Sequence, residues 1–329
     1  MNILIPDVLK PPADIEREVF GPGAKIFLGE ADKAEDISDE LWHSCDAILG
    51  WDRIEYDRPL LSKLKRCKVI VRVGVGYDNI DLLEATKRNI IVCNVPDYGT
   101  EEVADHAIAL LLSFSRGLIE YARRAQRRDW TRENHMPFRL NNKVMGIIGL
   151  GRIGTATAMR GKALGMRIVF YDPYINAGYD KALGMERVET LQEIAENSDI
   201  ISIHTPLTNE TKGMINEEFF KYVKRGAILI NTARGAIVDI FALERAMRAD
   251  TIRAAGLDVL PVEPPDESQR LIADWENDKD WLRGRLIVTP HVAFYSPEAR
   301  AEMRRKAALG AKRVLEGKQP MNRINRPQG

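Results

Sequence analysis

The chain has 329 residues, enough for about two domains of ordinary size. Hydrophobic residues make up 45% and charged residues 29% of the sequence, a balance typical of globular proteins that excludes disordered and collagen-like chains. Lysine and arginine number 48, as do aspartate and glutamate, so the net charge of zero argues against direct binding to nucleic acid or anionic lipid by bulk attraction.

Membrane, secretion and metal-site signals are weak in this sequence. No apolar run approaches the length of about 18 residues that spans a bilayer, and the first residues lack the pattern of a signal peptide. Cys45, Cys67 and Cys93 form no CxxC motif, so we expect no structural disulfide, no metal site and a cytoplasmic location.

In the first third of the chain, short apolar runs alternate with segments that have the period of a helix. Alternating strands and helices over this length predict a parallel, doubly wound α/β sheet. The expected strands are Asn2–Pro6, Lys25–Leu28, Ala47–Trp51, Lys68–Val73 and Ile90–Val95, and the expected helices include Leu60–Arg66 and Asp81–Arg88.

A segment without proline then runs from about Thr100 to Trp130. Apolar residues recur along it at helical spacing, so the pattern predicts one long helix that joins two α/β units. Its last turns carry four arginines, for which a solvated helix face is the ordinary interpretation and a phosphate site the alternative. These are Arg123, Arg124, Arg127 and Arg128.

The alternation of strands and helices then resumes. The expected strands are Val144–Gly149, Arg167–Tyr171, Ile200–His204, Ala227–Asn231, Ala254–Asp258 and Leu286–Thr289. A final helix is predicted from about Pro297 to Glu316, because proline suits a first helical turn and Gly317 follows the end. The stretch from Glu263 to Arg285 is expected to be irregular.

The strand expected at Val144 runs into a G-x-G-x-x-G motif, and a helix-compatible segment from Thr155 to Leu164 follows. In this context the first glycine, Gly149, allows a tight turn, Gly151 lets a pyrophosphate approach the backbone, and Gly154 lets the helix pack on the strand. The helix N-terminus would then face the anion. The sequence therefore predicts a dinucleotide site, with a plain glycine-rich turn as the alternative.

Asp172 lies 18 residues beyond the last glycine of this motif, at the end of the next expected strand. A carboxylate at that place accepts hydrogen bonds from the adenosine ribose and repels a 2′-phosphate. The sequence therefore predicts NAD rather than NADP.

Three successive expected strands end near Arg234, Glu263 and His291. Because ligands of open α/β sheets bind at the carboxyl ends of the strands, these side chains would share one rim. A guanidinium can hold the carboxylate of a 2-oxo acid, and an imidazolium can protonate its carbonyl oxygen as hydride arrives. An acidic partner fixes the imidazole tautomer. Taken singly, Arg234 would be interpreted as part of an ordinary salt bridge and Glu263 as a solvated loop acid; the three strand ends beside a dinucleotide loop favour the catalytic interpretation.

The other histidines carry weaker signals. His204 ends a strand and could border the cofactor, but no acid stands at matching spacing. His43, His106 and His135 are expected to be surface or capping residues. His291 is therefore the predicted acid.

Five segments, taken in this order, make the chain resemble the D-isomer-specific 2-hydroxyacid dehydrogenases over nearly its whole length. They are Arg72–Asp81, Gly149–Gly154, His204–Thr208, Asn231–Gly235 and Thr289–Tyr295. Within the family the chain is most similar to the C-terminal-binding-protein branch, although Val75 stands where that branch has serine.

The resemblance implies two Rossmann-like, doubly wound parallel-sheet domains with NAD in the cleft between them. Residues 1–99 with 295–329 would form a discontinuous, flavodoxin-like substrate and catalytic domain, and residues 100–294 the NAD-binding domain. The resemblance also implies a homodimer.

By the same resemblance, Arg234, Glu263 and His291 match the catalytic residues of the family. The residues that would contact NAD are Val75, Gly149, Gly151, Arg152, Ile153, Gly154, Asp172, Thr205, Pro206, Thr211, Thr232, Ala233, Arg234, Asp258 and His291. Those that would bind the substrate are Arg72, Gly74, Gly76, Arg234 and His291. The two glycines after Arg72 would let backbone N–H groups approach an anion, and a plain turn is the alternative.

The expected activity is the NAD-dependent interconversion of a small 2-oxo acid and its D-2-hydroxy acid. The alternative is an NAD(H)-dependent co-repressor-like scaffold with little turnover. A third candidate, 3-phosphoglycerate dehydrogenase, would be expected to carry a further regulatory domain. Tyr98, Phe294 and Tyr295 are compatible with an apolar substrate wall or with core packing.

The 28 positions between Glu263 and His291 make a longer gap than the family usually has. The extra segment, Gln269–Arg283, is expected to be a surface elaboration, with a lid or a subunit contact as the alternative.

Overall fold

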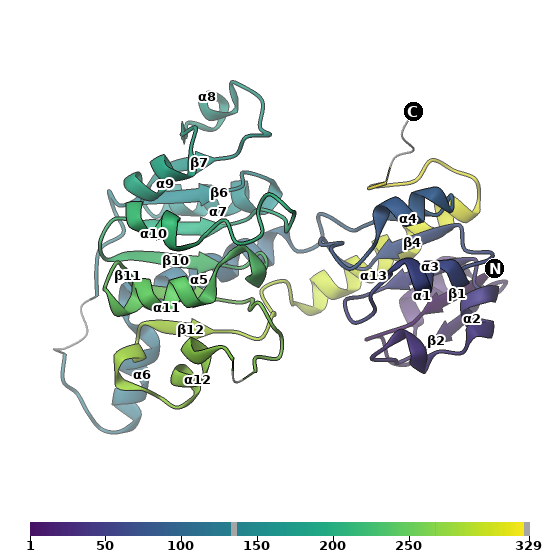
Figure 1. The fold of residues 1–329 in the computed structure, drawn as a ribbon, viewed down its shortest axis with the longest axis horizontal. Coiled ribbons are helices and arrows are strands. Elements are labelled where there is room, and N and C mark those ends of the chain that lie inside the picture. The colour runs from purple at the N-terminus through teal and green to yellow at the C-terminus, as the bar shows by residue number, and fades with distance from the viewer. Residues whose placement is uncertain (133–136, 267, 326–329) are drawn as a thin grey trace. The chain divides into compact units, whose positions relative to one another are not determined.

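The computed structural model describes residues 1–132, 137–266 and 268–325. The chain divides into two compact units, one formed by residues 1–99 with 295–329 and the other by residues 100–294. Each unit is an α/β structure (Figure 1).

The first unit is built on a five-stranded parallel sheet with the order β2-β1-β3-β4-β5, the flavodoxin-like order. Its strands are β1 (Asn2–Ile5), β2 (Lys25–Leu28), β3 (Ala47–Gly50), β4 (Val69–Arg72) and β5 (Ile91–Cys93). Its helices are α1 (Asp14–Phe20), α2 (Asp39–Ser44), α3 (Arg58–Lys63), α4 (Leu82–Lys87) and α13 (Pro297–Leu315), with a 3₁₀ turn, η1 (Ala34–Asp36).

The C-terminal helix α13 belongs to this first unit, where it packs on α1, β3 and β4. Small residues on its inner face, such as Ala307 and Ala311, are fully buried and allow a close approach to the sheet. Arg304 of α13 donates to Glu16 of α1 at 2.6 and 2.9 Å, and the Glu16 carboxylate is almost fully buried. This ion pair therefore ties the two ends of the sequence together.

The second unit is built on a seven-stranded parallel sheet with the order β12-β11-β10-β9-β6-β7-β8. Its strands are β6 (Val144–Ile148), β7 (Arg167–Tyr171), β8 (Glu186–Arg187), β9 (Ile200–Ile203), β10 (Ala227–Asn231), β11 (Ile252–Leu257) and β12 (Leu286–Val288). Its helices are α5 (Thr100–Arg116), α6 (Leu118–Gln126), α7 (Arg152–Ala163), α8 (Tyr179–Leu183), α9 (Leu191–Asn197), α10 (Glu217–Tyr222), α11 (Ile240–Arg248) and α12 (Arg270–Glu276), with 3₁₀ turns η2 (Gly235–Ile237) and η3 (Asp280–Leu282).

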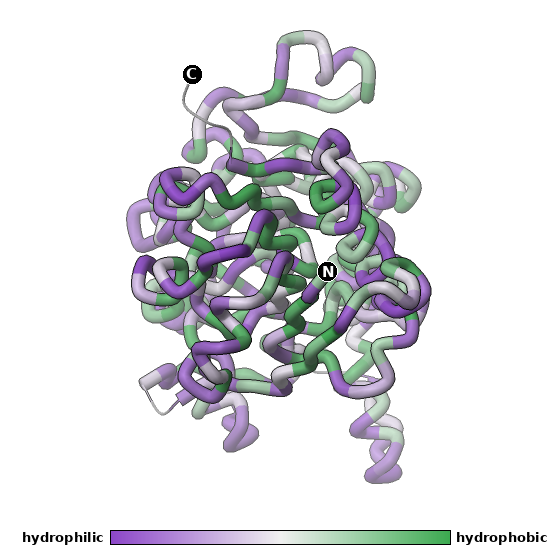
Figure 2. The backbone as a smooth tube through the Cα atoms, turned by 90° about the vertical axis from the view of Figure 1, so that its right-hand side faces the viewer, coloured by the Kyte–Doolittle hydropathy of each residue, from purple (hydrophilic) through white to green (hydrophobic). Residues whose placement is uncertain are grey.

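Side chains alternate between the two faces of this sheet, as the period of a strand requires. In β6, Met145 and Ile147 belong to the core beneath α5 and α7, whereas Val144 and Ile148 belong to the core beneath α9, α10 and α11. Both faces are therefore apolar, which explains why the strands are continuous hydrophobic runs. In Figure 2, green hydrophobic segments alternate along the tube with purple hydrophilic ones.

The strand positions predicted from the sequence are confirmed to within two residues at either end, and two parallel α/β sheets are confirmed as the fold class. The prediction of one helix from Thr100 to Trp130 is wrong. Gly117 adopts a left-handed conformation with φ of 63°, which ends α5 and separates it from α6. The two-residue strand β8 was not predicted, because it is too short to have an apolar pattern.

The stretch from Glu263 to Arg285 is more regular than predicted. It contains α12 and η3, whose Leu271, Ile272 and Leu282 enter the core of the second unit. The guanidinium of Arg248 lies 4.0 Å from the centre of the Trp281 ring. The segment is therefore a packed part of the unit.

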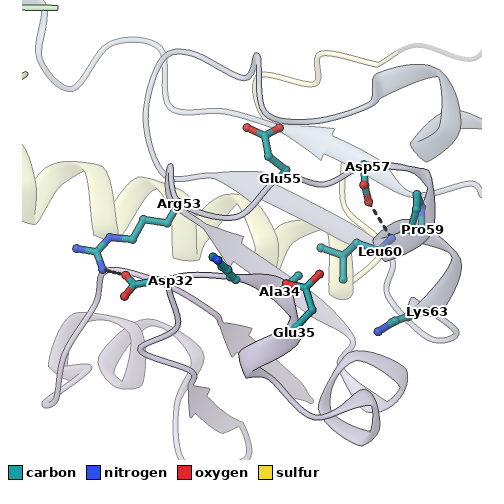
Figure 3. Close-up of a pocket in the computed structure, with 10 residues that line it drawn as sticks. Asp32, Ala34, Glu35, Arg53, Glu55, Asp57, Pro59, Leu60 and Lys63 are labelled. Atoms are coloured by element: carbon teal, nitrogen blue, oxygen red, sulfur yellow. Dashed lines mark hydrogen bonds and ion pairs between the residues drawn. The ribbon is translucent and has the colours of Figure 1, made fainter. Parts of the chain in front are cut away.

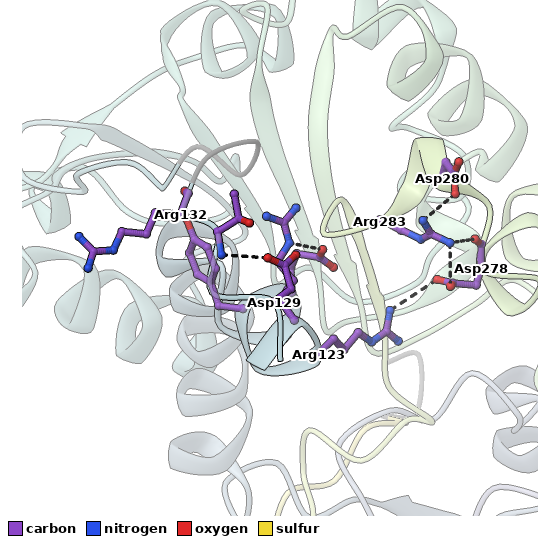
Figure 4. A network of polar contacts seen from close by, with 10 residues as sticks. Arg123, Asp129, Arg132, Asp278, Asp280 and Arg283 are labelled. Carbon is purple, nitrogen blue, oxygen red and sulfur yellow. Dashed lines mark hydrogen bonds and ion pairs between the residues drawn. The ribbon is translucent and has the colours of Figure 1, made fainter. Parts of the chain in front are cut away.

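Ion pairs join this segment to α6. Arg123 of α6 lies 3.6 Å from Asp278, and Arg283 pairs with both Asp278 and Asp280 (Figure 4). The side chains of Arg123 and Asp278 are about half exposed, at 52% and 49%, so the pair contributes little to stability. This arrangement supports the interpretation of the arginine run as a solvated helix face.

Candidate active site

The carboxyl ends of β6, β7, β9, β10, β11 and β12 carry the site residues of the second unit, since the sheet is wholly parallel. β6 is the first strand of this sheet in the sequence, and the later strands are added on both sides of it, β7 and β8 on one side and β9 to β12 on the other. This is the switch point at which open α/β sheets bind their ligands.

The glycine-rich loop after β6 has the geometry that its glycines predict. Gly149 has φ of +91°, a conformation that side chains of L-residues disfavour. A Cβ atom on Gly154 would stand 2.0 Å from the carbonyl oxygen of Gly149, so no larger residue fits there. The helix α7 can therefore start against the end of the strand.

The N-terminus of α7 is open to a ligand. Its N-cap is Gly151, which has no side chain to satisfy the first N–H groups. A Cβ atom added to Gly151 would meet nothing within 4 Å among the described residues. An anion can therefore approach the backbone and the positive end of the helix dipole.

Asp172 follows β7 and is bonded to the glycine-rich loop. Its two carboxylate oxygens accept N–H groups from Leu150 at 2.8 Å and Tyr174 at 2.9 Å. Each oxygen keeps a further lone pair, so a ribose hydroxyl could donate to this carboxylate as well. The acid thus stands where a dinucleotide site requires it, next to the phosphate loop.

Residues predicted to contact the cofactor follow β9 and β10. Thr211 closes the loop after β9, because its hydroxyl donates to the carbonyl of Pro206 at 2.6 Å and accepts the N–H of Thr208. Thr232 follows β10, and its hydroxyl is buried without a hydrogen-bond partner among the described residues. Buried hydroxyls are normally paired, so this one fits a partner supplied by a ligand.

His291 and Glu263 form a hydrogen-bonded pair. Nδ1 of His291 lies 2.8 Å from Oε2 of Glu263, and Oε1 of Glu263 accepts the N–H of Leu260 at 2.7 Å. Burial alone would raise the pKa of Glu263, but the bond to His291, its charge and the neighbouring donors together lower it. Glu263 is therefore held as a carboxylate that orients the imidazole.

Arg234 lies close enough for its positive charge to act on Glu263. The side chain of Asn231 fixes the loop that carries Arg234, since its Nδ2 donates to the carbonyl of Arg234 and its Oδ1 accepts the N–H of Ala233. Gly235 lets this loop pack on the next one, since a Cβ atom there would stand 1.9 Å from the carbonyl carbon of Leu260. The second unit thus brings the three predicted catalytic residues together.

Asp258 is buried, with 1% of its surface exposed. Its Oδ1 accepts the N–H of Val292 at 3.0 Å, and its Oδ2 accepts the N–H of Ala293 at 2.9 Å. It also accepts the hydroxyl of Thr289 at 2.6 Å. These three contacts lie within the segment that carries His291, and Nε2 of His106 on α5 lies 3.7 Å from Oδ1 of Asp258.

His204, which also ends a strand, differs from His291 in its surroundings. Its Nε2 lies 2.8 Å from the hydroxyl of Ser202, and burial lowers the pKa of His204 to about 3. A histidine with this pKa is neutral near pH 7 and has no proton to give. Its environment therefore supports the preference for His291 as the acid.

In the first unit, Arg72 ends β4 and its guanidinium folds over the following turn. Its Nη1 donates to the carbonyl of Val73 at 2.5 Å, and a Cβ atom on Gly74 would stand 2.2 Å from this Nη1. Gly74 has φ of +153°, and Val75 and Gly76 continue the turn. The glycine is therefore needed for the close approach of the guanidinium to the backbone.

Asp7 follows β1 in the same unit and was not singled out from the sequence. It is fully buried and accepts the N–H groups of Trp51 and Arg53, both at 2.9 Å. Burial raises the pKa of Asp7, while the two N–H donors and the charge of Arg72 act in the opposite direction. Its carboxylate thus links the loop after β1 to the one after β3.

A cavity of the first unit has a volume of about 240 Å³ and is lined by charges of both signs (Figure 3). Arg53 and Asp32 pair at its rim, and Lys63 is bonded to Asp39. Burial, followed by the charges of Asp78 and Asp57, raises the pKa of Glu55. Paired surface charges of this kind are ordinary, and the cavity offers no combination of an acid with a hydride or anion site.

Two of the aromatic residues considered for the substrate pocket lie in packed surroundings. Tyr98 is buried, and the ring of Phe294 meets that of His291 edge-on at 6.3 Å. All three cysteines are buried and free. Within the described ranges no three metal-ligating side chains gather, and no helix is long and apolar enough to cross a membrane. His135 lies outside the described residues.

His106 was predicted to be a surface or capping residue, and this prediction is wrong. Its Nε2 lies 3.0 Å from the hydroxyl of Thr289, close to the loop of His291. No pattern around His106 signals this contact, because Thr289 is 183 positions away along the chain.

Comparisons with known proteins agree with this geometry. The profile of the family described as D-isomer specific 2-hydroxyacid dehydrogenase, NAD binding domain, matches residues 108–293. A glyoxylate reductase of Korarchaeum cryptofilum is 35% identical over 332 residues, covering 96% of each chain. A D-3-phosphoglycerate dehydrogenase of Bacillus subtilis is 36% identical over 292 residues, but the chain spans only 53% of its length.

Solved structures show the same fold. The crystal structure of a D-lactate dehydrogenase from Aquifex aeolicus, in complex with NAD and lactic acid, has a TM-score of 0.83 and 29% identity, covering 96% of each chain. The open glycine-rich loop, the acid after β7 and the unpartnered hydroxyl of Thr232 fit NAD as the cofactor. The chain therefore belongs to the D-isomer-specific 2-hydroxyacid dehydrogenases, which are NAD-dependent enzymes.

Proposed function

We propose that the protein reduces a small 2-oxo acid to its D-2-hydroxy acid, and catalyses the reverse reaction, with His291 as the acid and base. The observation that carries this proposal is the 2.8 Å pair of His291 Nδ1 and Glu263 Oε2, with the charge of Arg234 beside it. When bound, NADH supplies the hydride.

The roles of the three residues follow from their atoms. Because Nδ1 of His291 is engaged with Glu263, Nε2 is the atom that holds the proton for the carbonyl oxygen. Glu263 stabilises the protonated imidazole by its charge. Arg234 binds the substrate carboxylate and polarises the carbonyl, since a planar guanidinium has donors enough for both.

For the cofactor we propose the contacts predicted from the sequence. The N-terminus of α7 would hold the pyrophosphate and Asp172 the ribose hydroxyls, which disfavours NADP. Thr232 would donate its buried hydroxyl, and the loop from Thr205 to Thr211 would line the other side. The other proposed contacts with the cofactor are Val75, Arg152, Ile153, Ala233 and Asp258.

The first unit would be the substrate domain, with the turn after Arg72 receiving the substrate carboxylate. The support is that the backbone at Gly74 and Gly76 has no side chains to obstruct an anion. Residues 100–294 would be the NAD-binding domain. The branch related to C-terminal-binding proteins and the cytoplasmic location remain predictions.

We propose glyoxylate and pyruvate as the first substrates to test. Relatives that match most of this chain are a glyoxylate reductase and a D-lactate dehydrogenase. Oxidation of NADH would be followed by absorbance with glyoxylate, pyruvate, hydroxypyruvate, 4-methyl-2-oxopentanoate and phenylpyruvate. Turnover that is lost in His291→Ala and retained in His43→Ala, a change of an exposed histidine, would support the proposal. No turnover with any acid, together with tight NADH binding, would favour the scaffold.

A homodimer is also proposed, with α6 as part of the contact. None of the side chains of α6 is buried. Leu118 and Ile119 in its first turn are 56% and 40% exposed, and Trp130, four residues beyond its end, is 82% exposed. A cavity of about 790 Å³ lies beside it, between α6 and the α12–η3 segment. Equilibrium sedimentation should give twice the chain mass of 37.2 kDa and a lower mass for Ile119→Asp. Tyr179→Asp, an exposed change elsewhere in this unit, is the control.

A further inference from the structure

A chain of hydrogen bonds leads from α5 to the loop of His291. Nε2 of His106 lies 3.0 Å from the hydroxyl of Thr289, and this hydroxyl lies 2.6 Å from Oδ1 of Asp258. The three residues come from α5, from the end of β12 and from the end of β11, all within the second unit. Neither His106 nor Thr289 has a place in the proposed reaction.

The direction of the hydrogen bonds follows from the groups involved. An ionised carboxylate can only accept, so the single hydroxyl proton of Thr289 is donated to Asp258. The hydroxyl must then accept from His106, whose Nε2 therefore carries a proton. This fixes the tautomer of neutral His106, and protonation at Nδ1 would leave the bond in place.

The far end of this chain holds the backbone around His291. Oδ1 and Oδ2 of Asp258 accept the N–H groups of Val292 and Ala293, and its carbonyl accepts the N–H of His291 at 2.8 Å. His291 has φ of +53°, a left-handed conformation that residues other than glycine adopt only when their surroundings hold them. The contacts of Asp258 are among those that hold it, together with the bond from the N–H of His291 to the carbonyl of Thr289 at 3.0 Å.

We propose that His106 is a positioning residue for His291, acting through Thr289 and the buried carboxylate of Asp258. The inference rests on the proposed role of His291 as the acid. Asp258 already receives two N–H groups from the loop, so the hydroxyl of Thr289 fixes the rotation of its carboxylate and His106 fixes Thr289. A small rotation of Asp258 would release the backbone on the far side of His291 and turn the imidazole.

The test removes the hydrogen bonds and keeps the shape of the side chains. Thr289→Val should lower kcat by about 10- to 100-fold, because misplacing a catalytic group by about 1 Å costs a factor of this size. The Tm should stay close to that of the wild type. The deuterium isotope effect with labelled NADH should rise, since the hydride step becomes slower. Thr289→Ser, which keeps the hydroxyl, should restore kcat.

The same comparison applies to His106. His106→Leu should lower kcat as Thr289→Val does, and His106→Gln, whose amide can donate in place of Nε2, should recover most of it. Combining Thr289→Val with His106→Leu should give no further loss, because both break one chain. Thr251→Val, a matched change in the same unit whose hydroxyl takes no part in the chain, is the control. Unchanged kcat in Thr289→Val would overturn the proposal.

A second measurement does not depend on turnover. Hydrogen exchange at the amides of Val292 and Ala293 should become about tenfold faster in Thr289→Val and His106→Leu, and stay unchanged in Thr251→Val. If the wild type reduces no 2-oxo acid, the proposed function fails and this exchange still tests the chain of contacts. Equal exchange in all variants would show that Asp258 is held without His106, and the proposal would be wrong.

Discussion

Nδ1 of His291 lies 2.8 Å from Oε2 of Glu263, although the two residues are 28 positions apart in the sequence, with α12, η3 and β12 between them. The other oxygen of Glu263 accepts the N–H of Leu260, so the carboxylate is held by a backbone contact as well as by the imidazole. Each side chain is 36% exposed, which leaves the pair accessible to a ligand. The arrangement is the one that the proposed role of His291 as acid requires, with its orientation set by a second group.

The first prediction concerns this pair. His291→Ala should lower kcat by about 100- to 10,000-fold, the range for loss of a general acid, with the Kd for NADH nearly unchanged. Glu263→Gln keeps the shape but loses the charge, so it should lower kcat less. Steady-state kinetics and NADH fluorescence titration give both quantities. Full activity in either variant would remove that residue from the proposed mechanism.

The second prediction concerns the choice of dinucleotide. Asp172→Ala removes the carboxylate that would repel a 2′-phosphate, so the ratio of kcat/KM for NADH over NADPH should fall by at least tenfold. Asp172 also accepts N–H groups of Leu150 and Tyr174, so the absolute rates should fall too. Asp172→Asn keeps an acceptor oxygen but not the charge, and it separates the two effects. An unchanged ratio in Asp172→Ala would mean that another group sets the preference.

The third prediction concerns Thr232, whose buried hydroxyl has no partner among the described residues. If it bonds the cofactor, Thr232→Val should raise the Kd for NADH by about tenfold, the worth of one hydrogen bond of about 1.4 kcal/mol. The free protein should be as stable as the wild type or more so, because an unpaired buried polar group is removed. Thr157→Val, which removes another unpartnered buried hydroxyl, located on α7, is the control. If Thr232→Val and Thr157→Val bind NADH with the same Kd, the hydroxyl of Thr232 makes no contact with the cofactor.

The fold was predictable from the sequence because its strands are buried on both faces. Such strands are continuous apolar runs, and Val144 to Ile148 is one in which every residue is buried. The phosphate loop was predictable too, because its three glycines stand at a fixed spacing directly after a strand, and the close contact of Gly154 with the carbonyl of Gly149 lies within that motif. The break at Gly117 was not, because glycine is tolerated inside helices and only its left-handed conformation ends α5.

The site was predictable only where a motif carries the chemistry. Arg234, Glu263 and His291 each follow one of three successive expected strands, and the needs of the reaction pointed to the three together. His106 and Asp7 were missed, because their partners are far away in the sequence and no local pattern reports a buried hydrogen bond. The packing of Leu271 and Ile272 was missed for a related reason, since a short helix gives too few turns for a clear apolar period.

The last prediction concerns stability in acid. The pKa of His204 is lowered to about 3 by burial, whereas an unfolded histidine has a pKa of about 6.5. Between these values the unfolded chain binds a proton that the folded chain does not, so the free energy of unfolding should fall as the pH falls from about 6.5, by up to about 1.4 kcal/mol per pH unit. His204→Gln should flatten this dependence in urea unfolding between pH 4 and pH 7, whereas His43→Gln, at an exposed position, should not. Parallel curves for the wild type and His204→Gln would contradict the lowered pKa.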